Sequence, residues 1–200
     1  MKVNEIFEGI QGEGKFVGTP CLFIRLSGCN RDCSWCDTKY HKQGKEVPLL
    51  NIVKVINESK LEGVVWTGGE PCLQREAIGT VITHTRHKKH MIETNGTITD
   101  NKFLMIFDYI SFSPKSRKDA KKLIDDMDLT LCHYDIKVVT DLRTVGRDMI
   151  KYSTMLMPLT TYNKKKDEEI KKKVWDYCLK YNIKYSPRLQ VDVWGMKRRV

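Results

Sequence analysis

The sequence predicts one α/β domain over residues 1–200, built as an open, partial parallel β/α barrel of about six strands. Short apolar, β-branched runs alternate along the chain with stretches of helical periodicity, which is typical of a parallel sheet covered by helices. A full eight-stranded barrel usually needs about 250 residues, whereas this chain has 200. An open, partial barrel therefore fits better than a closed one.

The expected strands are short and rich in Val, Ile, Leu, Phe and Tyr. They are LFIRL (22–26), GVVWT (63–67), MIET (91–94), YISFS (109–113), YDIKVV (134–139) and TMLM (154–157). Helices are expected between them, at 52–60, 75–87, 117–127 and 167–181. In the last of these, Ile170, Val174, Tyr177 and Tyr181 recur at the three- and four-residue spacing of one helical face.

Three successive strands are followed by small or polar residues. These segments are Thr67-Gly68-Gly69-Glu70-Pro71, Glu93-Thr94-Asn95-Gly96 and Ser113-Pro114-Lys115. Each could be ordinary turn chemistry, because Gly, Asn and Pro are common in turns. Parallel α/β proteins, however, bind their ligands on the loops that leave the carboxyl ends of the strands. Three such segments in succession favour a binding site at that edge.

Composition indicates a soluble, globular and cytoplasmic protein. No apolar run approaches the roughly 18–20 residues that cross a bilayer, and the N-terminus lacks the apolar core of a signal peptide. Lys and Arg number 35 against 25 Asp and Glu, a formal net charge of +10. This excess alternates with acidic residues on the expected helices, which favours a solvated surface over a nucleic-acid interface. We therefore expect neither a nucleic-acid nor a membrane partner.

The chain contains seven cysteines, and Cys29, Cys33 and Cys36 lie within one short segment after the first strand. Three thiolates at this spacing can each bind one iron of a cubane and leave the fourth iron open for a ligand. A zinc site with His41 as fourth ligand and three unliganded thiols are the alternatives. The other four cysteines, at 21, 72, 132 and 178, are expected to be small buried hydrophobes or neighbours of the site.

The cysteine segment resembles the signature of the radical S-adenosylmethionine (SAM) superfamily. Cys29, Cys33, Trp35 and Cys36 fill its pattern C-x-x-x-C-x-aromatic-C. Thr67–Pro71 resembles the glycine-rich motif of the superfamily, whose backbone meets the methionine amino group; glycine permits that approach because it has no Cβ. The resemblance implies a [4Fe–4S] cluster, SAM and the partial barrel of that superfamily. The radical arises at the cluster, so no catalytic side chain is assigned.

A narrower resemblance extends from residue 4 to the C-terminus, in family order. It is carried by EIFEGIQGEG (5–14), GTPCLFIRLSG (18–28), CDT (36–38), ETNG (93–96), SPK (113–115) and WGMKRRV (194–200). These segments resemble the family of 7-carboxy-7-deazaguanine synthases. The resemblance implies a lyase that converts 6-carboxy-5,6,7,8-tetrahydropterin to 7-carboxy-7-deazaguanine with release of ammonia, in queuosine and 7-deazapurine biosynthesis. It also implies Mg²⁺, a homodimer and a flavodoxin- or ferredoxin-type electron donor.

The same resemblance implies roles for individual residues. The substrate would be bound by Ile10, Gln11, Gly12, Glu13, Arg25, Thr67 and Val200, and SAM by Trp35, Cys36, Asp37, Gly69, Ser113, Pro114 and Lys115, with Thr38 at the magnesium position. A guanidinium can bind both oxygens of the substrate carboxylate, but Arg25 could instead pair with an acidic neighbour across the sheet. Trp35 can also serve core packing, and Glu93 and Asn95 fit a turn as well as a site.

Three residues depart from the family pattern. Met157 stands where the family often has Gln before Pro, which removes an amide from the SAM pocket. Gln190 replaces a histidine; it can donate a hydrogen bond but carries no charge. Arg199 replaces the glycine of a Lys-Arg-Gly-Val ending and makes the role of Val200 an open question.

Two other functions compete with this one. A glycyl-radical activase shares the cluster motif but has no need of a pterin-shaped pocket formed by Gln11–Gly14 and Arg25. A zinc-stabilised nucleic-acid-binding module would interleave basic and aromatic residues on one surface, whereas the aromatic residues here lie mainly in apolar runs. The sequence favours the deazaguanine synthase.

Overall fold

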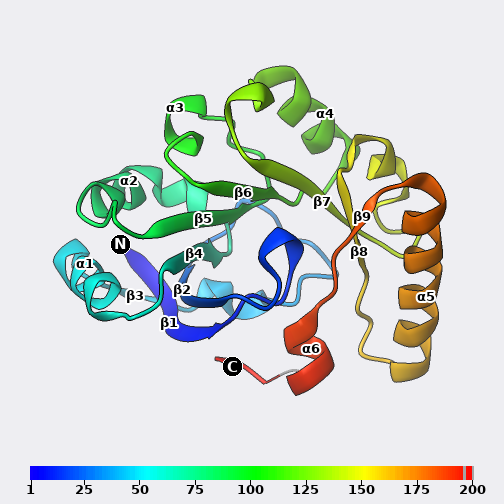
Figure 1. Ribbon diagram of the computed structural model, residues 1–200, viewed down its shortest axis with the longest axis horizontal. Helices are drawn as coiled ribbons and strands as arrows, with labels where there is room; N and C mark the ends of the chain where they lie inside the picture. Colours follow the sequence, from blue (N-terminus) through cyan, green and yellow to red (C-terminus); the bar gives the residue numbers. More distant parts are fainter. Residues whose placement is uncertain (196, 200) are drawn as a thin grey trace.

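A single curved sheet with two free edges forms the centre of the molecule (Figure 1). The computed structural model describes residues 1–195 and 197–199, and over this range the sheet has nine strands in the order β3-β1-β2-β4-β5-β6-β7-β8-β9. The sheet does not close on itself, so the prediction of an open, partial barrel is confirmed.

The six predicted strands form the parallel part of the sheet. They are β2 (Pro20–Leu26), β4 (Gly63–Gly68), β5 (Lys89–Thr94), β6 (Tyr109–Phe112), β7 (Tyr134–Thr140) and β8 (Met155–Pro158). Each pairs in parallel with the next, so their carboxyl ends lie at one edge of the sheet. The segments of small and polar residues after β4, β5 and β6 therefore lie side by side, as predicted.

Three strands were not predicted. β1 (Lys2–Ile10) pairs antiparallel with β2, β3 (Lys45–Glu46) pairs antiparallel with β1, and β9 (Lys184–Tyr185) pairs in parallel with β8. The sheet is thus mixed at one edge. β1 escaped detection because its buried residues include Glu5 as well as Val3, so it lacks the usual alternation of apolar and polar residues. The other two strands are only two residues long.

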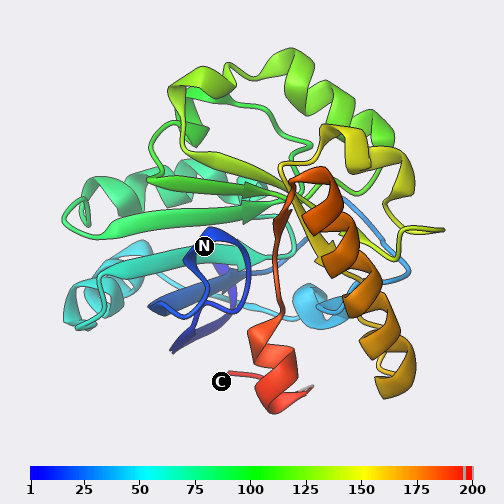
Figure 2. The ribbon, with the colours of Figure 1, turned by 45° about the vertical axis from the view of Figure 1, so that its right-hand side comes forward.

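All helices except the C-terminal one cover the outer, convex face of the sheet (Figures 1 and 2). The four predicted helices are α1 (Leu49–Glu58), α2 (Arg75–Thr83), α4 (Arg117–Asp126) and α5 (Lys164–Tyr181). Two short helices were not predicted, α3 (Asn101–Leu104) and α6 (Leu189–Trp194). Short 3-10 segments at Gly14–Phe16, Lys39–Lys42, Pro71–Gln74, Leu129–Leu131 and Arg147–Tyr152 connect the elements. Side-chain oxygens cap several helices; Ser116 Oγ, for example, accepts a hydrogen bond from the Asp119 N–H at 3.2 Å at the start of α4.

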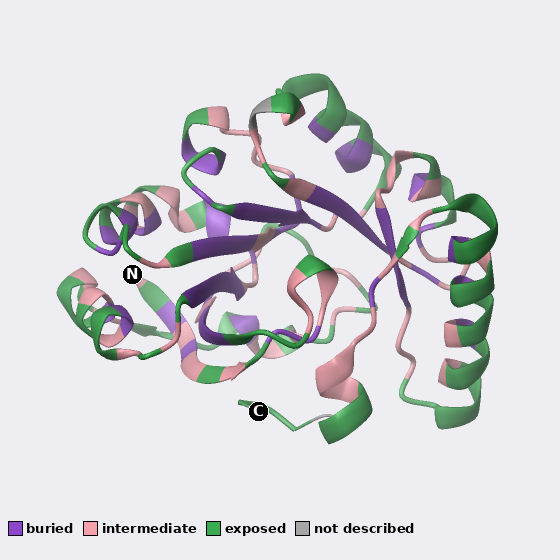
Figure 3. Ribbon diagram, in the orientation of Figure 1, coloured by how far each residue is buried: buried purple, intermediate pink, exposed green. Residues whose placement is uncertain are grey.

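Apolar side chains pack on both faces of the sheet, but the core on the outer face is larger than the cluster on the inner face. The main core lies between the sheet and the outer helices, and Figure 3 shows the buried strands with the inner faces of the helices against them. A smaller cluster of Cys21, Phe23, Val65, Met91 and Tyr109 fills the inner face toward the amino ends of the parallel strands. The carboxyl ends are left to polar side chains, which leaves room for a cavity there.

The scattered cysteines agree with the prediction of small buried hydrophobes at three positions. Cys21, Cys72 and Cys178 are buried, and Cys132 is half-buried. Among the helices of the described residues, none combines the length and the apolar character needed to cross a membrane.

Candidate active site

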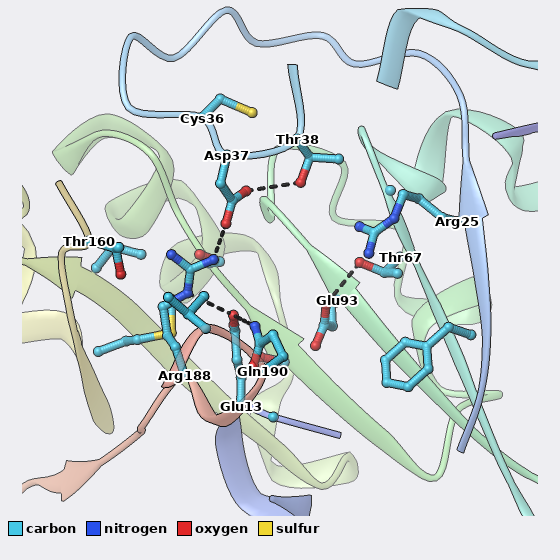
Figure 4. Close-up of a pocket in the computed structure, with 18 of the residues that line it drawn as sticks. Glu13, Arg25, Cys36, Asp37, Thr38, Thr67, Glu93, Thr160, Arg188 and Gln190 are labelled. Carbon is cyan, nitrogen blue, oxygen red and sulfur yellow. Dashed lines mark hydrogen bonds and ion pairs between the residues drawn. The ribbon is translucent and has the colours of Figure 1, made fainter. Parts of the chain in front are cut away.

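A cavity of about 290 Å³ opens at the carboxyl ends of the parallel strands (Figure 4). Each of the six parallel strands, β2 and β4 to β8, contributes at least one side chain to it. Those from the strands include Arg25, Thr67, Glu93, Ser111, Lys137 and Met157. The cysteine segment and the residues after α5 close the cavity from the other sides.

The three clustered cysteines lie on the loop after β2, and all are half-buried. Cys33 and Cys36 line the cavity, and the Cys36 N–H donates to the Cys33 carbonyl at 3.1 Å. The Arg31 N–H donates to Cys29 Sγ at 3.4 Å. Burial raises the pKa of the Cys29 and Cys33 thiols, and the ammonium of Lys115 is among the groups that oppose this rise. The positive charge of Lys115 therefore offsets part of the effect of burial, which disfavours the thiolates.

The described side chains contain no preformed group of three or more His, Cys, Asp and Glu around a single metal position. His41, the fourth ligand of the alternative zinc site, is buried within the 3-10 segment Lys39–Lys42. In a cubane each thiolate binds a different iron, so the three sulfurs do not need to converge on one point.

The glycine-rich segment after β4 packs directly on the cysteine loop. A Cβ at Gly69 would lie 1.9 Å from the Gly28 carbonyl oxygen and 3.1 Å from Cys29 Cβ. Gly68 has a φ of 131° and no room for a Cβ next to the Leu26 backbone. The two glycines thus allow the backbone of one ligand loop to lie against the other.

Glu70 joins the glycine-rich segment to the end of β5. Its side chain is fully buried, and its oxygens accept hydrogen bonds from Thr94 Oγ1 at 2.7 Å, the Asn95 N–H at 2.7 Å and the Cys72 N–H at 2.9 Å. Three donors compensate the burial of one carboxylate. The loops after β4 and β5 are therefore held as one unit.

The predicted SAM-binding residues divide into those that line the cavity and those that lie behind it. Trp35, Cys36, Asp37, Ser113 and Lys115 line the cavity, as does Thr38. Gly69 and Pro114 are not among the lining residues, although Gly68 is. Lys115 Nζ donates to Ser113 Oγ at 2.9 Å, so the segment after β6 presents one charged group to the cavity.

The predicted substrate-binding residues 10–13, Arg25 and Thr67 all line the cavity. At its centre they meet Glu93, for which the sequence left both a turn and a site role open. Glu93 Oε1 accepts from Gln11 Nε2 at 3.1 Å. Glu93 Oε2 accepts from Thr67 Oγ1 at 2.8 Å (Figure 4). Glu93 therefore faces the cavity and joins β5 to β4 and to the residue that follows β1.

Glu13 is the centre of a second polar cluster, which Figure 4 shows beside the first. It forms ion pairs with Lys137 Nζ and, at 3.2 Å, with Arg188 Nε, and Gln190 Nε2 donates to it at 2.9 Å. Burial alone would raise the pKa of Glu13, but the charges of Lys137 and Arg188 outweigh it and hold the pKa well below its usual range. Arg188 also pairs with Asp37, which ties this cluster to the cysteine loop.

Arg25 has both of the environments that the sequence allowed. It lines the cavity, and it lies opposite Glu5 in the register of β1 and β2, with Arg25 Nε 3.8 Å from Glu5 Oε1. Arg25 therefore pairs with an acidic residue on the neighbouring strand, Glu5, and still lines the cavity.

The three departures from the family pattern also lie at the site. Met157, Gln190 and Arg199 line the cavity. Gln190 approaches Gly12 so closely that a Cβ on Gly12 would lie 1.8 Å from Gln190 Oε1. Arg199 has a φ of 59°, the left-handed region in which the family's glycine is favoured. Val200, predicted to contact substrate, lies outside the described residues.

Several polar residues of the site could not be recognised from the sequence. Lys137, Arg188 and Tyr40 line the cavity, and Glu5 lies behind Arg25. Lys137 occupies the middle of the predicted strand YDIKVV, where a buried lysine stands among apolar neighbours. A lysine within an apolar strand was the one local feature of the sequence that could have marked Lys137 as a site residue.

Comparison with known proteins agrees with this geometry. The profile of the Radical SAM superfamily matches residues 23–158. A 7-carboxy-7-deazaguanine synthase of Thermoplasma acidophilum is 43% identical over 131 residues, which span 63% of this chain and 63% of that protein. One of Bacteroides thetaiotaomicron is 36% identical over 154 residues, 77% of this chain and 76% of that protein.

A solved structure shares the fold. The crystal structure of QueE from Escherichia coli superposes with a TM-score of 0.58 at 20% sequence identity, over 94% of this chain and 93% of that one.

Proposed function

Since the chain belongs to the radical SAM superfamily and, within it, to the family of 7-carboxy-7-deazaguanine synthases, we propose that it converts 6-carboxy-5,6,7,8-tetrahydropterin to 7-carboxy-7-deazaguanine with release of ammonia. The observation that carries this proposal is the position of Glu93. Its carboxylate lies between Gln11 and Thr67 in the cavity that Cys33 and Cys36 also line. The enzyme is thus a radical SAM lyase of the queuosine route.

The radical chemistry comes from the superfamily's cofactors. When bound, a [4Fe–4S] cluster and SAM supply a 5′-deoxyadenosyl radical. Cys29, Cys33 and Cys36 would hold the cluster. Trp35, Asp37, Gly69 and the segment 113–115 would hold SAM, with the ammonium of Lys115 next to an anionic ligand group. What the chain itself contributes is the position of the two ligands and the exclusion of water from the space between them.

A pterin suits the polar groups at the centre of the cavity. Its pyrimidine edge carries adjacent N–H donors and a carbonyl acceptor, and the cavity offers a carboxylate at Glu93, an amide at Gln11 and a hydroxyl at Thr67. Ile10, Gly12 and Glu13 complete this wall. Arg25 would bind the substrate carboxylate through its guanidinium. A small polar cavity of this kind favours a small molecule over the protein glycine of an activase.

Magnesium would bind at Thr38. Thr38 Oγ1 donates to Asp37 Oδ1 at 2.9 Å, so a hydroxyl and a carboxylate oxygen lie together at the rim of the cavity. Mg²⁺ prefers oxygen ligands and keeps several of its waters. A hydroxyl beside a carboxylate that is already paired with Arg188 would bind the ion mainly through water and substrate oxygens.

The proposal extends to the setting of the reaction. We include a cytoplasmic location, a homodimer and a flavodoxin- or ferredoxin-type electron donor. The net charge of +10 supports an acidic donor, because complementary charge steers association.

The test is a complete reaction with purified protein. The cluster is reconstituted anaerobically, and reductant, SAM, Mg²⁺ and 6-carboxy-5,6,7,8-tetrahydropterin are added. We expect mass spectrometry to detect 7-carboxy-7-deazaguanine. We also expect the formation of 5′-deoxyadenosine or the turnover of SAM to depend on the presence of the pterin. Formation of 5′-deoxyadenosine without the deazaguanine would leave the superfamily intact and contradict the substrate.

A further inference from the structure

Glu5 is a buried carboxylate that none of the proposed binding roles uses. Its side chain is 1% exposed, although it lies on the antiparallel part of the sheet near an edge. Among the described residues, three guanidiniums converge on it: Arg198 Nη2 at 2.6 Å, Arg199 Nε at 3.1 Å and Arg25 Nε at 3.8 Å. One carboxylate thus joins β1, β2 and the C-terminal segment 197–199.

A β-bulge directs Glu5 toward this position. In the register of β1 and β2, Val3 lies opposite Leu26 and Glu5 lies opposite Arg25, so Asn4 is an extra residue on β1. A bulge re-aims the side chains that follow it. Asn4 is itself held, because its Nδ2 donates to the Tyr40 carbonyl at 2.9 Å. The hydrogen bond from Asn4 therefore stabilises the bulge, and the bulge places Glu5 opposite Arg25.

Tyr40 completes the contact on the side of the cysteine loop. The guanidinium carbon of Arg198 lies 3.7 Å from the centre of the Tyr40 ring, and that of Arg25 lies 5.9 Å from it. Both are within the range of cation–π attraction. Arg198 is thus held by a carboxylate on one side and by an aromatic ring on the other, which fixes segment 197–199 at the rim of the cavity.

Among the described residues, the charges of this group do not balance. Three arginines face one carboxylate, and Arg25 Nε has no hydrogen-bond partner among the described residues although it is buried. Arg25, Arg198 and Arg199 all line the cavity. The surplus of positive charge at this wall suits an anionic ligand group, and Glu5 prevents the guanidiniums from repelling one another while that group is absent.

We propose that Glu5 is a positioning residue that holds Arg25 and segment 197–199 together at the mouth of the cavity, so that the carboxylate of the substrate meets a prepared group of guanidiniums. The identity of that carboxylate as the pterin's rests on the proposed function. The anchoring of the C-terminal segment by Glu5 does not, since it depends only on contacts within the chain.

The experiment compares Glu5→Gln with Glu8→Gln in the full-length, cluster-loaded enzyme. Glu8 lies on the same strand but is exposed and contacts only Ser59 among the polar groups described, so it is a matched control. The first measurement is brief trypsin digestion without substrate, followed by intact mass to detect cleavage after Lys197. We expect Glu5→Gln to lose residues 198–200 about tenfold faster than wild type or Glu8→Gln, because the neutral amide replaces charge-assisted hydrogen bonds from Arg198 and Arg199 with weaker ones.

The second measurement separates substrate binding from radical formation. Glu5→Gln should raise the KM for the pterin about tenfold or more, while the 5′-deoxyadenosine formed from SAM without pterin stays at the wild-type rate. A loss of both would indicate general damage and overturn the positioning role. If wild type makes no deazaguanine but trypsin still distinguishes Glu5→Gln from Glu8→Gln, the anchoring is supported and only the proposed substrate fails.

Arg198→Met tests the same contact from the other side if Glu5→Gln does not fold. This change is at a partly exposed residue and keeps Lys197 as the cleavage site. It should also expose the segment to trypsin. In the double variant Glu5→Gln/Arg198→Met, the increases in cleavage rate should be less than additive, because both changes remove the same interaction. Wild-type protection in Arg198→Met, or full additivity in the double variant, would overturn the proposal.

Discussion

The side-chain amide of Asn95, at the end of β5, donates a hydrogen bond to Asn30 Oδ1 at 2.9 Å, and Asn30 directly follows the first cysteine of the cluster loop. Asn30 Nδ2 in turn donates to Thr97 Oγ1 at 2.8 Å. The segment Glu93–Gly96 therefore does more than turn the chain. It supports the loop that carries Cys29, Cys33 and Cys36.

Replacement of Asn95 by Ala should weaken the retention of the cluster. A lost hydrogen bond costs about 0.5–1.5 kcal/mol, which corresponds to about 2- to 10-fold faster loss of iron to a chelator. Asn30→Ala should have the same effect, because it removes the other half of the contact. Asn51→Ala, at an exposed position of α1, is the control and should release iron at the wild-type rate.

Cys33→Ala should abolish radical formation. A cubane bound by two thiolates loses one of its three protein ligands, so iron and sulfide content should fall and 5′-deoxyadenosine should drop to background. Cys132→Ala, which changes a half-buried cysteine outside the cluster loop, should keep both. Cleavage of SAM by Cys33→Ala would contradict the mechanism.

Glu93→Gln should impair binding of the pterin more than radical formation. The amide cannot accept hydrogen bonds from both Gln11 and Thr67, since one of its two polar atoms is a donor. Loss of a hydrogen bond to a charged group predicts a rise in KM of about 10- to 100-fold. Uncoupled 5′-deoxyadenosine formation should be unchanged. The matched control is Glu62→Gln, at a position exposed to solvent, and an unchanged KM in Glu93→Gln would exclude the carboxylate from the pocket.

Two Gly→Ala changes should have opposite effects on the free energy of unfolding. Gly69→Ala places a Cβ 1.9 Å from the Gly28 carbonyl oxygen, and overpacking of this kind costs about 1–3 kcal/mol. Gly79→Ala in α2 meets no atom within 4 Å and should stabilise the helix by about 0.5–1 kcal/mol. Thermal unfolding of both variants tests this, and destabilisation by Gly79→Ala would contradict the geometry of α2.

The buried His90 should make stability depend on pH. Trp66 Nε1 donates to His90 Nδ1 at 3.0 Å, and burial lowers the pKa of this imidazole. Below the ordinary histidine value of about 6.5 the unfolded chain therefore binds a proton that the folded chain does not, so the free energy of unfolding falls with falling pH. His90→Gln should flatten that dependence, whereas His84→Gln, at an exposed histidine, should leave it as steep as in wild type.

Much of the fold follows from local pattern. The four longer helices were recognised because each buries one face, which leaves a periodicity in the sequence. The six parallel strands were recognised as short apolar runs, because most of their residues are buried on both faces of the sheet. β1 was missed because a bulge and the buried Glu5 interrupt this periodicity. α6 was missed because, among its described residues, none is fully buried, so it has no apolar face to detect.

For the site, the sequence by itself predicted the chemistry of the cysteine loop, since Cys29, Cys33 and Cys36 lie within one short segment and the glycine-rich residues form a second short motif. Tertiary structure alone decided which charges meet. Glu13 pairs with Lys137 and Arg188, and Glu5 pairs with Arg198, across more than a hundred residues of chain. Such pairs leave no spacing in the sequence, because an ion pair depends on the distance between two side chains and not on the number of residues that separate them.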